Sequence, residues 1–351
     1  MNNRKINILF TIPNFKTAGS QQVVLSLFEN LNNTLFKPFV CVESYPEQIP
    51  EIIPEERRLI FRFTGLGPGD FRKFRKLLKA NQIDIVHSWD YKSNYTEALA
   101  TRFSNVKYLY TKKNNSWNKR WILKSLISHH IAYDNPLMEK RFFKSFFFKN
   151  KITFIPHGVD LNRFLRKKKI QKDIKNLICV GNINKNKNQL YILKSLKELP
   201  KDIILHLYGN ENQTYKKELL EYINTHHLTD QVVFNGYVSN TKLPSILHKM
   251  DVFVLASVNE GLPVSLLEAM ASGLLVLSSD SGGGSKYILG EERIFDITDK
   301  NSLKNKLQNL MTLEEEEIKN EIEKNFLRIK DEFTVEREVE LYQKLYNALL
   351  K

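Results

Sequence analysis

Two glutamates, Glu260 and Glu268, are the residues whose type and spacing most clearly predict chemistry in this sequence. Glu260 lies in a polar stretch that follows a short apolar run. Glu268 is surrounded in the sequence by apolar residues: Leu266, Leu267, Ala269 and Met270. Its carboxylate is therefore predicted to be half-buried, and such a group needs hydrogen-bond donors, for which a pair of sugar hydroxyls is suitable. The alternative is an ordinary helix in which Glu268 faces solvent.

The segments around the two glutamates predict a strand, a loop, a helix and a second strand, in that order. Residues 251–256 form a short apolar run that is typical of a buried parallel strand. Pro263 suits the first position of a helix, and Gly273 ends the helical pattern. Open α/β sheets bind ligands at the carboxyl ends of their strands, and the free N–H groups of a helix start favour phosphate. The unit therefore predicts a ligand with both phosphate and hydroxyl groups, a nucleotide sugar.

The sequence E-G-L-P-V-S-L-L-E-A-M-A-S-G at 260–273 resembles the E-x7-E signature of retaining glycosyltransferases of family 4, which have the GT-B fold. The resemblance implies that Glu260 is the catalytic-site carboxylate, in contact with the donor sugar. It implies that Glu268 binds the ribose hydroxyls of the donor. It also implies that the donor phosphates lie against three residues between the glutamates: Gly261, Leu262 and Pro263.

The resemblance extends to other parts of the donor site. The family has an Arg directly after the first strand of the second domain and a Lys five residues later; here these are Asn182 and Lys187. The two cations clamp the donor diphosphate in the family, so a lone lysine gives less charge compensation. Tyr237 and Val238 match a turn beside the nucleotide base, and Gly19 matches a loop that approaches the donor phosphates. The alternatives are a solvated loop lysine at position 187 and a tight turn at position 19.

Three residues are predicted to lie on the acceptor side: His87, Lys113 and Asn114. His87 ends an apolar run, and we prefer a structural histidine to a catalyst as its interpretation. Many members of the family carry a histidine just after the strand predicted at 108–111. No histidine stands there in this chain, and Lys113 or Asn114 occupies the equivalent region.

The fold class expected is α/β, because strands and helices alternate in each half of the chain. The resemblance implies a GT-B fold: two doubly wound Rossmann-like domains facing each other across a cleft, with a C-terminal helix that crosses back to the first domain. Pro156-His157-Gly158-Val159-Asp160 resembles the segment that ends the first domain, with His157 in place of an Asn. We predict an acceptor-binding domain at 1–168, a donor-binding domain at 169–334 and the crossing helix at 335–351.

The chain is basic, and the positive charge is concentrated. It has 351 residues and a net charge of +14, and residues 102–172 alone hold 18 Lys and Arg against three acids. This distribution predicts an anionic partner: a lipid surface, a phosphorylated acceptor or nucleic acid. A predicted helix after Pro136 carries four phenylalanines among lysines: Phe142, Phe143, Phe146 and Phe147. They would either contact lipid headgroups or face the domain core, and we favour the core for most of them. Residues 71–80 predict a second basic helix.

No run of 18 or more apolar residues occurs, and the first residues do not have the pattern of a signal peptide. Cys41 and Cys179 lie singly in apolar runs, which favours buried thiols over a disulfide framework. We therefore expect a cytoplasmic protein, with peripheral attachment to the inner face of the cell membrane as a hypothesis.

The function expected from the resemblance is transfer of a sugar, with retention, from a UDP- or GDP-linked donor to a saccharide or lipid-linked acceptor. Surface polysaccharide biosynthesis is the setting that it suggests. No D-x-D pair for a divalent ion occurs, and the family needs none, so we expect neither a metal nor a further cofactor. Three alternatives remain: a nucleotide-sugar epimerase of the same fold, a basic nucleic-acid-binding protein, and a binding protein that has lost activity. No module for nucleic acid is recognised.

Overall fold

The computed structural model describes residues 4–13, 19–45, 50–63, 68–89, 95–167 and 172–351. Residues 168–171 of the basic segment lie outside these ranges. The chain forms two compact units, one made of Met1–His157 with Val335–Lys351 and the other of Gly158–Thr334. The sequence analysis placed the first division at 168. The structure places it after His157, because Val159 N–H donates to Phe333 O (2.8 Å) and Phe164 packs in a core of the second unit.

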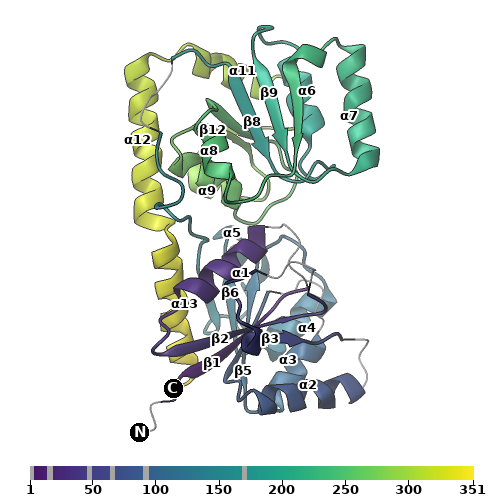
Figure 1. Ribbon diagram of the computed structural model, residues 1–351, viewed down its shortest axis with the longest axis vertical. Coiled ribbons are helices and arrows are strands. Elements are labelled where there is room, and N and C mark those ends of the chain that lie inside the picture. The colour runs from purple at the N-terminus through teal and green to yellow at the C-terminus, as the bar shows by residue number, and fades with distance from the viewer. Residues whose placement is uncertain (1–3, 14–18, 46–49, 64–67, 90–94, 168–171) are drawn as a thin grey trace. The chain divides into compact units, whose positions relative to one another are not determined.

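The first unit contains a seven-stranded parallel sheet with the order β3-β2-β1-β4-β5-β6-β7 (Figure 1). Its strands are β1 Ile6–Thr11, β2 Phe36–Val42, β3 Arg58–Ile60, β4 Ile85–Ser88, β5 Lys107–Lys112, β6 His130–Tyr133 and β7 Ile152–Phe154. Its helices are α1 Gly19–Asn30, α2 Pro68–Ala80, α3 Tyr95–Arg102, α4 Lys119–Ile127, α5 Leu137–Phe142 and α13 Val335–Leu349. The central strands β1, β4 and β5 are buried along almost their whole length, as is typical of a parallel sheet covered on both faces.

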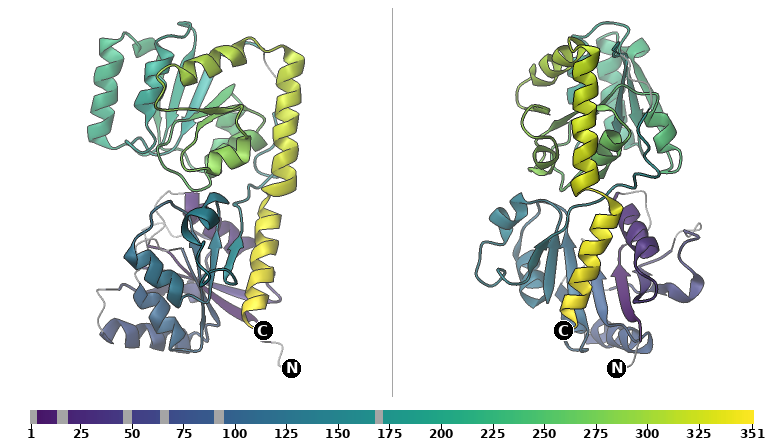
Figure 2. Two further views of the ribbon diagram at one scale, coloured as in Figure 1. Left: turned by 180° about the vertical axis from the view of Figure 1, so that it is seen from behind. Right: turned by 90° about the vertical axis from the view of Figure 1, so that its left-hand side faces the viewer.

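The C-terminal helix α13 is a part of the first unit and packs on one face of its sheet (Figure 2). Leu9 and Val86 point to a core shared with α2 and α3. Their strand neighbours Phe10 and His87 point the other way, where the His87 ring meets Tyr346 of α13. The predicted helix at 335–349 is therefore confirmed, and its apolar face holds it on the sheet.

The second unit contains a six-stranded parallel sheet with the order β10-β9-β8-β11-β12-β13. Its strands are β8 Asn176–Val180, β9 Ile204–Tyr208, β10 Val232–Gly236, β11 Val252–Leu255, β12 Leu275–Ser279 and β13 Ile294–Phe295. Its helices are α6 Gln189–Leu196, α7 Gln213–Thr225, α8 Leu243–Leu247, α9 Val264–Ala271, α10 Gly284–Leu289, α11 Ser302–Met311 and α12 Glu315–Glu332. Val252 and Val254 enter one core and Phe253 and Leu255 the other, so the sheet is covered on both faces.

The four phenylalanines after Pro136 are divided between core and surface. The helix α5 ends at Phe142, and Phe142 and Phe143 are buried against Trp117. Phe146 and Phe147 are 84% and 70% exposed. The expectation that most of these rings face the core is correct for two of them and wrong for the other two. Helix formation stops before the last two rings, so they do not follow the apolar face of α5.

Cys41 and Cys179 are buried free thiols, as expected. In the part of the chain that the structure describes, no helix is both long and apolar enough to cross a bilayer.

Candidate active site

The order of the second sheet places its ligand site between β8 and β11. The chain winds from β8 to β9 and β10 on one side and from β11 to β12 and β13 on the other, so the winding direction changes between these two strands. Doubly wound sheets bind ligands in the crevice that opens at such a point, outside the carboxyl ends of the strands. The loops that follow β8 and β11 contain the predicted residues Lys187 and Glu260.

The structure brings Lys187 and Glu260 together. The Lys187 Nζ lies 2.7 Å from the Glu260 Oε1, and both side chains are about four-fifths buried. The two loops are also joined by their backbones, since Val258 N–H donates to Asn186 O (2.7 Å). The loop lysine is therefore not simply solvated.

Gly181 is required for Lys187 to reach the site. Its φ of +149° is one that other residues rarely adopt. A Cβ at this position would lie 2.7 Å from the Cε of Lys187, so a side chain would push the lysine out of its path. The glycine that ends β8 therefore allows the lysine stem to pass directly over the backbone.

The loop with Glu260 is fixed by its neighbour, the glycine-rich loop before α10. Glu260 N–H donates to Ser281 O (2.7 Å). A Cβ on Gly284 would lie 1.8 Å from the carbonyl oxygen of Gly261, closer than any two such atoms can approach. Gly261, Leu262 and Pro263 are buried under this contact, at the start of α9.

Replacing Gly284 by alanine is expected to displace the Glu260 loop. Because the Cβ would overlap backbone rather than a flexible side chain, relief requires movement of the loop or of α10. We expect a loss of about 2 kcal/mol in the stability of the second unit, as for other overpacked sites. Urea unfolding measures it, and Gly69→Ala is the matched control because a Cβ there meets nothing within 4 Å. Equal stability of the two variants would contradict the prediction.

Glu268 lies in α9 and is 8% exposed, which is more buried than the half-burial predicted. Burial raises the pKa of its carboxyl to about 7, and the charge of Arg163 acts in the opposite direction. Among the described residues its carboxylate has no hydrogen-bond partner. The Nη2 of Arg163 is likewise buried without one. Arg163 was not predicted, although it stands only three residues after the segment that resembles the end of a first domain.

The remaining donor-side residues lie around the same edge of the sheet. Asn182 follows Gly181 in the loop after β8, is exposed, and accepts a hydrogen bond from Gln189 Nε2 through its carbonyl oxygen (3.1 Å). Tyr237 is 54% exposed after β10, and Val238 packs on a core of the unit. The described residues hold no cluster of three or more His, Cys, Asp and Glu side chains arranged for a metal ion.

Gly19 and the three acceptor-side residues belong to the first unit. Its sheet changes winding direction between β1 and β4. Gly19 is the exposed first residue of α1, which follows β1. Lys113 and Asn114 follow β5, the neighbour of β4, and are partly exposed. Lys113 Nζ donates to Trp89 O (2.9 Å) and lies 5.0 Å from the centre of the Trp89 ring.

His87 does not reach the acceptor side, so this assignment is corrected. Its ring is 0% exposed, and both ring nitrogens are hydrogen-bonded inside the unit, to the hydroxyl of Tyr346 (2.7 Å) and to Thr111 Oγ1 (2.8 Å). Burial lowers its pKa well below the usual value, and the charge of Lys113 adds to the effect. His87 is a neutral structural histidine that joins the sheet to α13.

Lys112 supports the loop that carries Asn114, a role that sequence reasoning did not assign. Its ammonium is buried, lies 4.2 Å from the centre of the Trp121 ring, and donates to Asn114 Oδ1 (2.7 Å). Burial lowers its pKa to about 7, Asp134 raises it, and Lys124 lowers it further. The aromatic ring and the asparagine replace part of the hydration that the ammonium loses.

The two parallel α/β units have the architecture of the GT-B fold, which solved structures share over almost the whole chain, and a carboxylate and a lysine are paired at the switch point of the second sheet. Residues 162–326 match the family model described as glycosyl transferases group 1, and residues 17–163 match the model described as glycosyltransferase family 4. The chain belongs to the group 1 glycosyltransferases and is a transferase enzyme.

Curated relatives span almost the same length. A UDP-Gal:alpha-D-GlcNAc-diphosphoundecaprenol alpha-1,3-galactosyltransferase from Escherichia coli is 25% identical to this chain. The match covers 94% of this chain and 93% of the relative. The capsular polysaccharide biosynthesis glycosyltransferase CapH of Staphylococcus aureus is 28% identical. That match covers 78% of this chain and 81% of the relative.

Solved structures share the fold. A glycosyltransferase from Rickettsia africae has a TM-score of 0.85 at 15% identity, over 99% of each chain. Anabaena HepE in complex with UDP-glucose has a TM-score of 0.83 at 15% identity, over 98% of this chain and all of the other. At these identities the similarity shows the fold alone.

Proposed function

We propose that this enzyme transfers a sugar, with retention of anomeric configuration, from a UDP- or GDP-linked donor to a saccharide or lipid-linked acceptor. The observation that carries the donor part is the ion pair between Lys187 and Glu260 at the switch point of the second sheet. A nucleoside diphosphate needs a cation for its phosphates and an acceptor for its hydroxyls. The two loops and α9 supply these groups side by side.

The proposed donor binding exchanges partners at this ion pair. The donor diphosphate takes the Lys187 ammonium, and the Glu260 carboxylate, released from it, accepts a hydrogen bond from a hydroxyl of the donor sugar. The ribose hydroxyls donate to the buried carboxylate of Glu268, which among the described residues has the charge of Arg163 near it but no hydrogen-bond donor. During transfer a hydroxyl oxygen of the acceptor bonds to the anomeric carbon as the bond from that carbon to the diphosphate breaks. Negative charge builds on the departing phosphate oxygens, which take up the proton that the hydroxyl releases. Lys187 and the N–H groups at the start of α9 stabilise that charge.

The test is a panel of nucleotide sugars with thermal unfolding as the readout. One base is expected to raise the unfolding midpoint, because a ligand that binds only the folded state stabilises it. The transfer assay that follows, with the selected donor and chelator present, is expected to proceed, since the proposed charge stabilisation uses no metal. NMR of the product reports the anomeric configuration. A panel in which no nucleotide sugar stabilises the protein would overturn the proposal, and stabilisation by oligonucleotides alone would favour nucleic-acid binding.

Donor affinity is expected to rise with pH between 6 and 8. The ribose hydroxyls need an ionised Glu268, and burial has raised the pKa of this carboxyl to about 7. Below that pH most of the protein carries the protonated form, so the dissociation constant of the nucleotide sugar should be about ten-fold higher at pH 6 than at pH 8. Calorimetric titration measures it. The sugar-linked diphosphate does not itself titrate in this range, so an affinity independent of pH would contradict the role of Glu268.

A lipid-linked acceptor is proposed because the first unit has features of a membrane-facing surface. Phe146 and Phe147 are exposed, and exposed lysines, Lys144 and Lys149, lie on either side of them. Exposed rings beside cations are typical of surfaces that contact anionic headgroups. The relative from Escherichia coli is named for a diphosphoundecaprenol-linked sugar, and its similarity to this chain supports a lipid-linked acceptor here. Surface polysaccharide assembly is the corresponding setting.

The proposed surface predicts binding to anionic vesicles. Wild-type protein should sediment with vesicles that contain phosphatidylglycerol and remain in solution with phosphatidylcholine alone. Replacing Phe146 and Phe147 by serine is expected to weaken sedimentation about ten-fold or more, because each ring buries apolar area in the headgroup region. A double replacement of two exposed leucines elsewhere, Leu220 and Leu327, is the control. Equal sedimentation with phosphatidylglycerol and with phosphatidylcholine vesicles would contradict the proposal.

A further inference from the structure

A second concentration of charge lies in the first unit, on the basic helix α2. Its buried face holds Phe74 and Leu78, and its exposed face carries Arg72, Arg75 and Lys79. With Lys76, these residues follow the spacing of three and four that places side chains on one side of a helix. Like charges at this spacing repel one another and weaken the helix by a few tenths of a kcal/mol per pair. Among the described residues, Arg72, Lys76 and Lys79 have no acidic partner.

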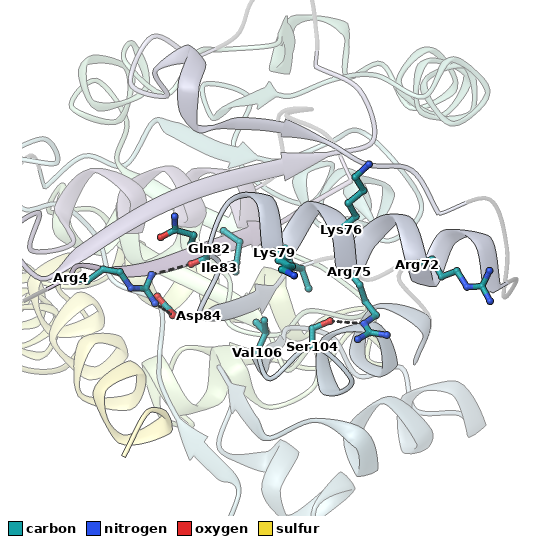
Figure 3. A pocket seen from close by; sticks show the side chains of 11 residues that line it. Arg4, Arg72, Arg75, Lys76, Lys79, Gln82, Ile83, Asp84, Ser104 and Val106 are labelled. Atoms are coloured by element: carbon teal, nitrogen blue, oxygen red, sulfur yellow. Dashed lines mark hydrogen bonds and ion pairs between the residues drawn. The ribbon is translucent and has the colours of Figure 1, made fainter. Parts of the chain in front are cut away.

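The cationic face borders a pocket of about 480 Å³. Leu78, Ile83 and Val106 form apolar parts of its lining, and Gln82 and Ser104 contribute polar groups. Figure 3 shows the Arg4–Asp84 ion pair at one end and Arg72 at the other, with Lys79 and Arg75 between them. The charged residues that line the pocket are five cations and one acid: Arg4, Arg72, Arg75, Lys76, Lys79 and Asp84.

The acid is already neutralised, and one cation is held in place. Arg4 Nη2 donates to Asp84 Oδ1 (2.6 Å), and the other carboxylate oxygen of Asp84 accepts the N–H of Asn7 (2.8 Å). Arg75 donates through its Nε to Ser104 Oγ (3.2 Å), and its guanidinium lies 5.5 Å from the centre of the Phe71 ring. Within the described part of the chain, the pocket therefore has more positive charge than its single acid compensates, and Arg75 is held in place at its side.

The pocket lies at the amino-terminal edge of the first sheet. Arg4 precedes β1, Asp84 precedes β4, and Val106 precedes β5. Ligands of the reaction bind at the opposite edge, where Lys113 and Asn114 follow β5. A site here is separate from the acceptor and donor sites and does not depend on the proposed function.

We propose that this pocket binds a ligand with two or more phosphate groups. The helical face from Arg72 to Lys79 is about 10 Å long, which is enough for two phosphates to be held at once. Guanidinium groups and ammonium groups are the side chains that bind phosphate oxygens most strongly, and a bound anion removes the repulsion along α2. The phosphates belong either to a free oligophosphate or to phospholipid headgroups, and the experiment separates the two sources.

The experiment is hydrogen exchange of the full chain with inorganic triphosphate, followed by mass spectrometry. Protection is expected at residues 70–84, and any binding at the donor site appears separately, at 181–187 and 260–268. In the variant R75Q/K79Q, the triphosphate concentration needed for half-protection of 70–84 should rise about ten-fold or more. The control K194Q/K217Q removes two exposed lysines of the second unit and should protect as wild type does. No protection at 70–84, or equal protection in R75Q/K79Q, overturns the proposal.

Vesicle sedimentation with the same variants identifies the source of the phosphate. If R75Q/K79Q loses triphosphate protection and also sediments less with phosphatidylglycerol vesicles, the site takes a lipid headgroup. If sedimentation is unchanged, the site takes a free oligophosphate. Each result counts only if triphosphate protects residues 70–84 in the wild type. Vesicle binding through Phe146 and Phe147 alone therefore cannot produce either result.

Discussion

Replacing Glu268 by glutamine is expected to lower kcat/KM for the nucleotide sugar about a hundred-fold. The amide keeps the shape but loses the charge that makes two hydrogen bonds to the ribose strong, a loss of about 3 kcal/mol. The stability of the protein should move the other way. Burial is the main cause of the raised pKa of Glu268, so the ionised carboxylate lowers the stability of the folded protein above pH 7. The glutamine variant should therefore unfold at pH 8 at the wild-type temperature or higher.

A loss of activity without a loss of stability distinguishes a binding residue from a structural one. Activity is measured by initial rates at varied donor concentration, and stability by thermal unfolding of the same preparations. Glu221→Gln, on the solvent face of α7, is the control for loss of one carboxylate and should alter neither quantity. If the Glu268 variant keeps its donor KM and kcat, or loses activity only because it unfolds, the ribose role is wrong.

The unit around these glutamates could be predicted because its signals are local. The strands at 252–255 and 275–279 and the helix at 264–271 appear where the apolar runs, Pro263 and Gly273 indicate. Other elements give weaker signals. β13 has two residues, and neither α3 nor α4 was predicted, although the side chain of Asn118 caps α4 by accepting the N–H groups of Arg120 and Trp121.

The contacts inside the site were less predictable than its residues. Lys187 meets Glu260 because β8 and β11 are neighbours in the sheet, and the sequence does not state strand order. Arg163 lies near Glu268 because its turn packs beside α9. The two residues are about a hundred positions apart in the sequence, which does not reveal this contact. His87 has the position of a site residue at a strand end, but only the fold shows that α13 covers it.

His157 illustrates the same dependence on distant segments. It stands where the family has an Asn, at the last position of the first unit before the chain passes to the second. Its Nδ1 lies 3.1 Å from Glu338 Oε1 in α13, and its Nε2 lies 3.3 Å from Asp134 Oδ2 after β6. All three side chains are buried, and the ring stacks on Trp89. Burial alone would lower the His157 pKa, but the two carboxylates outweigh it and raise the pKa to about 9.

Replacing His157 by alanine is therefore expected to destabilise the first unit strongly. The imidazolium pairs with two buried carboxylates, and removing it takes one cationic partner from each, at a loss of about 3 to 5 kcal/mol. For a unit of this size, the unfolding midpoint should fall by roughly 6 to 20 °C. Calorimetry at pH 7 measures it. His129→Ala, which removes a half-buried histidine of the same unit, is the control, and an equal loss in the two variants would contradict the ionic role.

The pH dependence distinguishes charge from packing at this cluster. A histidine whose pKa is raised by folding contributes its full stability below its ordinary pKa of about 6.5, and the contribution is lost as pH rises through about 9. The difference in stability between wild type and His157→Asn should therefore shrink from pH 7 to pH 10. Adding Glu338→Gln to that variant removes one of the two carboxylates that faced the imidazolium and should restore part of the loss, a coupling that a double-mutant cycle measures. If the histidine acted by its size alone, the asparagine variant would show the same deficit at every pH, and the second substitution would add to it.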